Sequence, residues 1–265
     1  MSITVTTEKQ FESDIEAFLI SPEGGYTKGN GTYTPKLGLY PDKLISFIQR
    51  TQPREWAVFE RQNDIDPVRK FCVAFNNACD MDGVLHVMRN GFKHRGTTFK
   101  VCYFKPESTL NDTAGIQYAE NEVECYRQWY YSADTKKSAD MVLVLNGIPV
   151  FAFELKNQYT GQNVDNAKAQ WMYDRDQREI CFQFNKRILA YFCVDHTEVW
   201  MTTKLAGKDT YILPFNQGSN GAGYDFGSGY RKIVVFLNIV HLCVCDLYFW
   251  FFGHCRRLYL LLFFY

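Results

Sequence analysis

The sequence predicts an α/β fold in which a mixed β-sheet is flanked by helices. Three observations support this fold class. Apolar residues recur at helical spacing in the first third of the 265-residue chain. A hairpin of two strongly apolar runs occupies the middle, and one further helix and a second pair of strands follow it. This order is typical of neither a repeat protein nor a helix bundle.

The first helix is expected from about Glu8 to Ile20. Its start is marked by Thr7 and Gln10, which are spaced as a capping box, and apolar side chains then follow at helical spacing. Glu12 and Glu16 fall on the other face of this helix. A solvated helix face is the more ordinary role for these two residues, and a position in an active site is the alternative.

Two more helices and two strands are expected before the hairpin. Pro41 suits the first turn of a second helix, and Asp66-Pro67 begins a third. The inward faces of these helices are expected to be Leu44, Ile45, Phe47 and Ile48, then Val68, Phe71, Cys72 and Phe75. Residues 97–106 alternate like a strand, and the segment 121–132 is expected to be its neighbour.

The hairpin is the strongest local signal in the chain. Its apolar runs, 141–145 and 148–153, flank Asn146-Gly147. Asn-Gly favours a type I′ turn, because both central residues of that turn need a positive φ. The two runs are therefore expected to be antiparallel neighbours.

Three ionisable residues, Asp140, Glu154 and Lys156, interrupt the apolar pattern of this hairpin. Because side chains alternate along a strand, Glu154 and Lys156 share one face, and Asp140 lies beside them at the open end. An exposed ion pair where a strand frays is one interpretation. The other is a divalent-metal hydrolase site, in which Asp140 and Glu154 bind Mg²⁺ and Lys156 orients a water molecule or offsets developing charge.

One helix and one strand pair are expected after the hairpin. Residues 164–176 carry apolar side chains at helical spacing, and either Asn163 or Asp165 is expected to cap this helix. The segments 188–194 and 199–203 are expected to form two neighbouring strands.

The composition restricts the class of protein. Formal net charge is +0, so no global basic field indicates nucleic acid, and any contact with DNA must come from local patches. The nine cysteines show neither Cys-x-x-Cys pairs nor the spacing of a zinc site, and no signal peptide precedes them. We therefore expect reduced thiols in a cytoplasmic protein.

The residues of the hairpin resemble a known nuclease motif. Asp140 followed by Glu154-Leu155-Lys156 is similar to the motif of PD-(D/E)xK nucleases, although a motif this short occurs by chance in many proteins. Longer phrases are more specific, and they lie at residues 92–106, 140–171 and 190–218. Together they resemble the N-terminal nuclease domain of type I restriction enzyme R (restriction) subunits, over roughly residues 7–225.

The resemblance implies a restriction-endonuclease-like core and an endonuclease that cleaves double-stranded DNA with Mg²⁺. Asp140 and Glu154 would be the metal ligands, and Lys156 would position the water or stabilise charge. The family also places a Gln-x-x-x-Tyr motif on the next helix. Here Gln170 and Tyr173 are one residue closer, but they still fall near one face of an α-helix. An ordinary helix surface is the alternative for both.

The resemblance also implies partners. R subunits work with modification and specificity subunits, and an ATP-driven motor follows their nuclease domain. Because this sequence contains no P-loop motif, ATP is expected only in the full-length subunit. The first hypothesis is an endonuclease domain that is truncated before the motor. The second is a non-catalytic DNA-binding or assembly module derived from the same subunit.

The domain boundaries are expected at residues 1–229 for the nuclease domain and 230–265 for an atypical apolar tail. Residues 233–265 contain ten aromatic side chains but only three charged ones, Asp246, Arg256 and Arg257. A membrane helix, a buried helix and a remnant of a shifted reading frame are three interpretations, and we favour the third. No membrane association is expected, because Asn238, His241 and Asp246 interrupt the apolar run.

Overall fold

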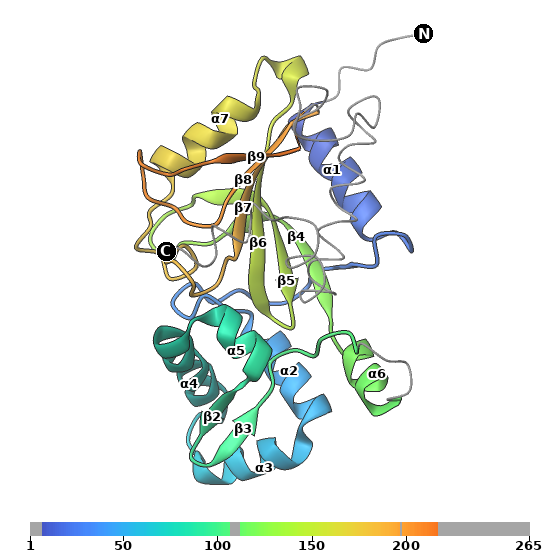
Figure 1. Cartoon of the computed structure of the whole chain (residues 1–265), viewed down its shortest axis with the longest axis vertical. Coiled ribbons are helices and arrows are strands. Elements are labelled where there is room, and N and C mark those ends of the chain that lie inside the picture. Colours follow the sequence, from blue (N-terminus) through green and yellow to red (C-terminus); the bar gives the residue numbers. More distant parts are fainter. Residues whose placement is uncertain (1–6, 107–111, 197, 217–265) are drawn as a thin grey trace.

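A computed structural model describes residues 7–106, 112–196 and 198–216 (Figure 1). The predicted boundary at residue 229 and the apolar tail 230–265 lie outside the described residues. Within them, a mixed β-sheet carries helices on both faces and a helical lobe at one end. The predicted fold class, a mixed sheet flanked by helices and consistent with a restriction-endonuclease-like core, is confirmed.

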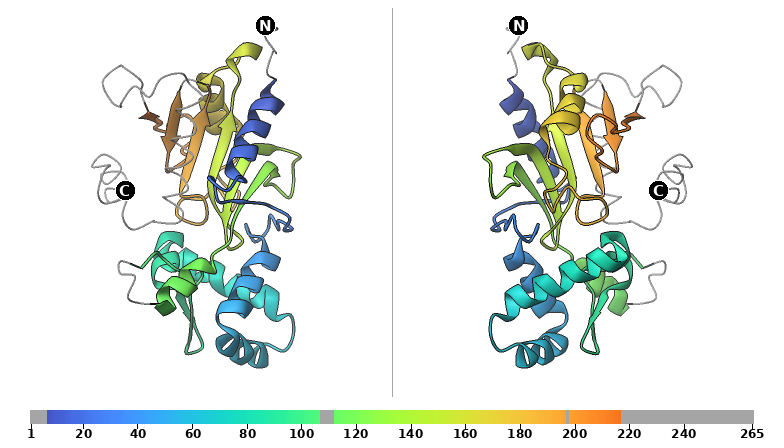
Figure 2. Two further views of the ribbon diagram at one scale, coloured as in Figure 1. Left: turned by 90° about the vertical axis from the view of Figure 1, so that its right-hand side faces the viewer. Right: turned by 90° about the vertical axis from the view of Figure 1, so that its left-hand side faces the viewer.

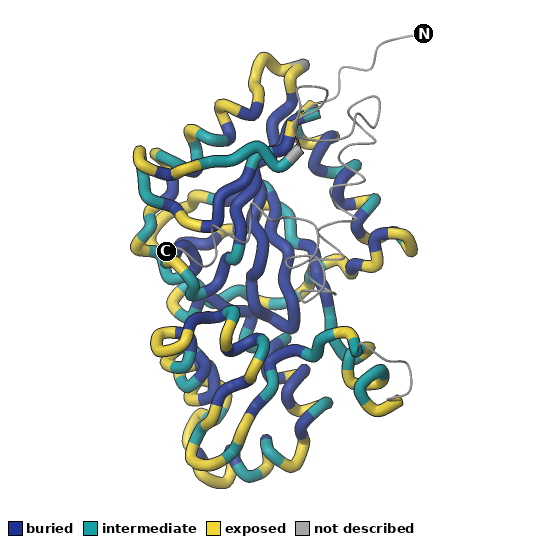
Figure 3. The backbone as a smooth tube through the Cα atoms, in the orientation of Figure 1, coloured by how far each residue is buried: buried dark blue, intermediate teal, exposed yellow. Residues whose placement is uncertain are grey.

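The sheet has seven strands in the described part of the chain, in the order β1-β4-β5-β6-β7-β8-β9. Their bounds are β1 Thr27–Lys28, β4 Val123–Tyr130, β5 Ser138–Leu145, β6 Ile148–Leu155, β7 Ala190–Val194, β8 Val199–Thr202 and β9 Leu213–Asn216. The pairs β1–β4 and β6–β7 are parallel, and the other neighbours are antiparallel. The central strand β6 is buried along its whole length (Figure 3). A polar side chain on β6 is therefore placed in a nearly dry environment.

Helices α1 (Glu8–Leu19) and α7 (Val164–Ala169) cover opposite faces of this sheet (Figures 1 and 2). Alternation along β5 explains the two faces: Met141 packs in the cluster of α1, and Val142 packs in the cluster of α7. Only one of the two hydrogen bonds of the predicted capping box of α1 is present. The Thr7 hydroxyl accepts a hydrogen bond from the Gln10 backbone N–H, but the Gln10 side chain donates to Asp14 instead of to the cap.

The helical lobe lies beyond the turn of the hairpin (Figure 1). It contains α2 Pro41–Thr51, α3 Pro53–Gln62, α4 Pro67–Asp82, α5 Val84–Asn90, β2 Phe92–His94 and β3 Thr97–Phe99. Its interior is rich in phenylalanine; the rings of Phe59, Phe71 and Phe99 contact one another edge to face. Helix α6 (Asp112–Ala119) connects the lobe to β4. The sequence did not indicate α3, and Val68, expected to be inward, is 39% exposed.

The predicted pairing of residues 97–106 with 121–132 is wrong. Strand β3 ends at Phe99 and pairs with β2, whereas β4 lies between β1 and β5. Between β2 and β3, Arg95 and Gly96 both have positive φ, 46° and 86°, so this segment closes its own tight turn. A short loop between neighbouring strands loses less chain entropy than pairing with a distant segment.

The predicted Asn-Gly turn of the central hairpin is confirmed: Asn146 and Gly147 have φ of 49° and 82°. This turn also joins the sheet to the lobe. The Gly147 carbonyl accepts from the Tyr40 N–H at 2.9 Å, and a Cβ at Gly147 would lie 2.6 Å from the backbone nitrogen of Leu44. The Asn146 side chain donates to the carbonyl of Val101 at 3.0 Å. The hairpin therefore has one end fixed against the lobe and the other, where Asp140 and Glu154 lie, free to form a site.

Two further expectations concern cysteine and the membrane. The six cysteines within the described ranges, Cys72, Cys79, Cys102, Cys125, Cys181 and Cys193, are free and buried, as expected for reduced thiols. None of the helices in the described residues combines the length and the apolar character needed to cross a bilayer.

Candidate active site

Asp140 is the third residue of β5 and lies at the open end of the hairpin. One of its carboxylate oxygens, Oδ2, accepts a hydrogen bond from the backbone N–H of Leu155 at 2.7 Å and lies 3.4 Å from Nζ of Lys156. The structure thus brings Asp140 and Lys156 together, as the hairpin geometry predicted. Asp140 is inside the strand rather than just before it, and this position fixes its backbone.

Lys156 is almost fully enclosed, with a side chain 3% exposed. Its Nζ also lies 2.8 Å from Oε1 of Glu8 and donates to the carbonyl of Leu155 at 3.1 Å. Burial alone would lower the pKa of Lys156. The charge of Asp140 and the hydrogen bond to Glu8 raise the pKa by more than burial lowers it, so the pKa lies above its usual value. Lys156 is therefore a fixed ammonium held between carboxylates from β5 and α1.

Glu154 is fully buried on β6. Its Oε1 accepts from Nε of Arg175 at 3.0 Å and from Nη2 of the same guanidinium, while its Oε2 has no hydrogen-bond partner. Burial raises the pKa of Glu154 to about 8, the negative charge of Asp140 adds to this rise, and Arg175 opposes it. One oxygen of this carboxyl group is thus held and the other is left without a donor.

Arg175 is the main residue of the site that sequence reasoning missed. Besides Glu154, its guanidinium donates to the carbonyl of Ser138 at 3.0 Å and to the Tyr131 hydroxyl at 3.3 Å. It also lies over the rings of Tyr131 and Trp171, at 5.5 Å and 5.7 Å from their centroids. Arg175 therefore fixes the Glu154 side chain from the opposite side of the sheet to α1.

The side chains of Gln170 and Tyr173 do not face the same site. Helix α7 ends at Ala169, and residues Gln170–Asp174 form a π-helical turn instead of the predicted α-helix to 176. A π turn contains more residues than an α turn, so residues three apart no longer share a face. The Gln170 Oε1 atom is buried without a partner, whereas Tyr173 is 69% exposed. Among the described contacts, none joins Tyr173 to Asp140, Glu154 or Lys156.

The prediction that Glu12 and Glu16 lie on a solvated face is wrong: they are only 2% and 8% exposed. Arg127 of β4 pairs with both, at 3.1 Å and 3.4 Å, and Gln128 donates to Glu12 at 3.0 Å. Burial raises the pKa of Glu12, and Asp140 is among the charges that contribute. These two carboxylates follow directly after the inward residues of α1, so the helix flank that carries them rests on the sheet.

Gln128 itself has an unusual backbone, with φ of 49° in the middle of β4. The flanking pairs Arg127–Met141 and Trp129–Ala139 place it across from Asp140. Positive φ at a residue other than glycine is costly and is commonly retained at functional sites. The strain therefore lies directly beside the carboxylate of the candidate site.

Comparison with known proteins bears on this cluster. Residues 60–210 match the family model of the type I restriction enzyme R protein N terminus. This chain belongs to that family. No curated protein matched the chain. The segment matched to the R protein N terminus contains Asp140, Glu154, Lys156 and Arg175, but helix α1 lies before it. Glu8 and Glu12 join the site through packing of α1, not through the matched segment.

The donor set suits a hard divalent cation. Within the described residues, no group of three or more acidic, histidine or cysteine side chains is arranged to hold a metal ion. Mg²⁺, however, commonly takes only one or two protein carboxylates and keeps several waters. Asp140 and Glu154 are the two carboxylates, and the partnerless Oε2 of Glu154 is a buried acceptor that a cation would satisfy. Asp140 and Glu154 are therefore the residues that would hold such an ion.

Proposed function

We propose that this chain carries the Mg²⁺-dependent endonuclease site of a type I restriction R subunit, and that it hydrolyses phosphodiester bonds of double-stranded DNA. The observation that carries the proposal is the cluster at the open end of the hairpin. There, Asp140 and Lys156 lie in contact, and the buried Glu154 keeps one oxygen without a partner. This cluster lies inside the segment that shows the family.

The proposed roles follow from the contacts. Asp140 and Glu154 would hold the ion, which when bound would polarise the phosphodiester and lower the pKa of a water molecule. Lys156 has a raised pKa, so it stays protonated and acts as a donor that offsets negative charge on the phosphate, not as a general base. Arg175 positions Glu154 by binding its Oε1.

We assign different roles to Gln170 and Tyr173, the two residues of the shortened Gln-x-x-Tyr pattern. Gln170 has a buried oxygen without a partner, and we assign to this acceptor the role of binding the attacking water. Tyr173 is largely exposed, which supports contact with the DNA instead of participation in hydrolysis. Both roles belong to the proposal and depend on the same reaction.

The second candidate function is a non-catalytic DNA-binding or assembly module. The observation that favours it is the engagement of Glu154 with Arg175 in full burial, because a carboxylate held this way is less available to an ion. In either case the expected setting is the cytoplasm, with double-stranded DNA and the modification and specificity subunits as partners.

Cleavage and metal binding separate the two functions. Supercoiled plasmid would be incubated with the full chain and Mg²⁺ or Mn²⁺, alone and after addition of modification and specificity subunits. Asp140→Asn, Glu154→Gln and Lys156→Ala are each expected to lower the cleavage rate by on the order of 100-fold. Glu60→Gln, an exposed substitution on α3, is the control.

Mn²⁺ binding, followed by electron paramagnetic resonance, gives the second readout. Asp140→Asn should weaken binding, and Lys156→Ala should not. Mn²⁺ binding without cleavage by the complete complex would favour the assembly module. Cleavage by the Glu154→Gln variant at the rate of the unmodified chain would end the catalytic assignment.

A further inference from the structure

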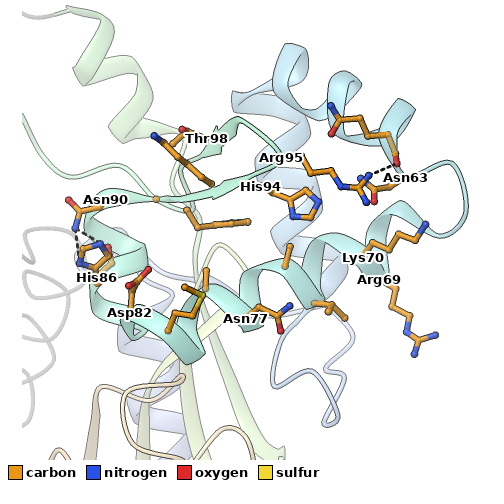
Figure 4. Close-up of a pocket in the computed structure, with 18 of the residues that line it drawn as sticks. Asn63, Arg69, Lys70, Asn77, Asp82, His86, Asn90, His94, Arg95 and Thr98 are labelled. Carbon is orange, nitrogen blue, oxygen red and sulfur yellow. Dashed lines mark hydrogen bonds between the residues drawn. The ribbon is translucent and has the colours of Figure 1, made fainter.

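The helical lobe contains a groove that the proposed reaction does not use (Figure 4). It has a volume of about 1100 Å³ and lies between α4 and the β2–β3 hairpin. The turn at Asn146-Gly147 packs on the start of α2, whereas Asp140 and Lys156 lie at the opposite end of the same hairpin. The length of the central strands therefore separates the groove from the candidate active site.

The groove is basic, although the chain as a whole is neutral. Its lining contains four cations, Arg69, Lys70, Lys93 and Arg95, and two acids, Asp66 and Asp82. Four positive and two negative side chains give a formal charge of +2, with histidine counted as neutral, against +0 for the whole chain. The Asp66 carboxylate also caps α4, accepting from the Arg69 N–H at 3.1 Å.

The cations of the groove have no acidic partner among the described residues. All four are exposed, and Arg95 donates to a neutral acceptor, the Gln62 carbonyl, at 3.1 Å. Several cations outside the groove do pair with acids, as in Lys43–Glu124 at 2.8 Å and Arg127–Glu12 at 3.1 Å. Exposed cations without partners can neutralise the phosphates of a nucleic acid and release the counterions condensed on it.

The cations lie on both walls of the groove. Arg69 and Lys70 come from α4, and Lys93 and Arg95 come from the hairpin. Neutral polar side chains also line the groove, namely Asn77, His86, Asn90 and Thr98. Arginine, lysine and amide or hydroxyl side chains in one groove are the groups that contact phosphate and sugar in protein–DNA complexes.

We propose that this groove binds the phosphate backbone of duplex DNA, as a contact separate from the hydrolytic site. The inference rests on the proposed function only in that an endonuclease of this family meets long duplex DNA. It needs neither the metal nor Glu154. Since the contacts are to phosphates, the groove binds without preference for sequence.

The same lining would also suit an acidic protein segment, because Ile65 and Met81 at the groove are 76% and 82% exposed. The positive charge distributed over both walls favours the regularly spaced phosphates of a duplex. The experiment therefore includes a competitor that carries carboxylates instead of phosphates.

Duplex binding by the full chain is measured by fluorescence anisotropy without divalent metal, using a labelled duplex of arbitrary sequence. The test variant combines Arg69→Gln, Lys70→Gln, Lys93→Gln and Arg95→Gln. The matched control combines Lys36→Gln, Arg54→Gln, Arg61→Gln and Lys208→Gln, which are exposed, lie outside the groove and remove the same charge. Two of these control residues lie in the same lobe, on α3.

The groove variant is expected to bind on the order of tenfold or more weakly at low salt, with a salt slope reduced by about one for each lost contact. The control should bind like the unmodified chain. Equal binding by the groove variant and the control overturns the inference. Displacement of the duplex by poly-glutamate at equal charge concentration also overturns it, in favour of an acidic protein partner.

The result is separable from the proposed function. Duplex binding is measured without divalent metal, whereas cleavage is measured with Mg²⁺ or Mn²⁺, so each readout can fail while the other holds. If the complete complex fails to cleave but the groove variant loses duplex binding, the inference stands and the hydrolytic role fails. If cleavage depends on Glu154 while the groove variant binds normally, the reverse holds.

Discussion

The active-site end of the hairpin and the groove of the helical lobe both concentrate charge, but they compensate it differently. At the hairpin, Lys156 is 3% exposed and contacts Glu8 and Asp140, and Arg175 is bound to Glu154. In the groove, Arg69 and Lys93 are exposed and have no acidic partner among the described residues.

This difference has a physical explanation. Charges that are removed from water lose solvation, so they persist only where partners compensate them and fix their geometry. Such preorganisation suits chemistry on one bond. Charges that stay in water keep their mobility and their counterions, and they suit binding to an extended polyanion.

The largest effect on stability is expected at the buried pair. Arg175→Ala removes all described donors to Glu154 and leaves its carboxyl group buried without a partner. The free energy of unfolding should fall by about 3 kcal/mol, measured by urea denaturation. The double variant Arg175→Ala, Glu154→Gln should lose less than the sum of the single effects, because each single variant already disrupts the contact between the two side chains. Strict additivity would show that the two residues are not coupled.

The next effect concerns pH. Burial raises the pKa of Glu154 from its ordinary value of 4.5 to about 8, so between these values the folded protein retains a proton that the unfolded chain releases. The contribution of this group to stability is therefore complete below its unfolded pKa and is lost as pH rises to about 8.

Urea midpoints of the unmodified chain and of Glu154→Gln at about pH 5 and about pH 8 measure this term. The unmodified chain should lose more stability than Glu154→Gln over the interval. Subtracting the loss of stability in Glu154→Gln from the loss in the unmodified chain cancels the contributions of other groups, such as Glu12, whose pKa is also raised by burial. A parallel response of both proteins would place the burial of Glu154 in doubt.

The parts of the structure that sequence could predict depend on local signals. The hairpin follows from Asn146-Gly147, because few dipeptides accept two positive φ angles. The start and the buried face of α1 follow from Thr7 and from apolar spacing. Asp140 and Lys156 could be brought together because both lie at the open end of one antiparallel hairpin. The register shift between Leu143 and Val144, which changes the exact partners at that end, could not be predicted.

The parts that sequence could not predict depend on contacts between distant segments. Glu8 contacts Lys156, which lies 148 residues away in the sequence. Arg127 pairs with Glu12, which lies 115 residues away in the sequence. No local pattern contains either pairing. Arg175 reaches Glu154 after a π turn, and helical periodicity assumes that such turns are absent. The short run His94-Arg95-Gly96-Thr97 is a turn signal that could have corrected the pairing of β3.

A smaller effect is expected at the partly exposed edge of the site. Glu8 is 30% exposed, and Asp140 and the Leu155 carbonyl still contact Lys156 when Glu8 is neutral. Glu8→Gln should therefore lower the free energy of unfolding by no more than about 1 kcal/mol. A fall in cleavage greater than in Glu60→Gln would show that α1, which lies before the matched segment, contributes to the site. A much larger loss of stability would mean that this ion pair holds α1 on the sheet.

The smallest effect on stability is expected in the groove. Neutralising Arg69, Lys70, Lys93 and Arg95 removes exposed charges that no described carboxylate pairs, and such surface changes alter stability by about 0.5 kcal/mol or less each. Relief of repulsion among four like charges in one groove should even offset part of that loss. The melting temperature should therefore match that of the Lys36, Arg54, Arg61 and Lys208 control, while duplex binding does not. A groove variant that is markedly less stable than the control would show that these cations hold the lobe together, and the contrast between the two charged regions would then fail.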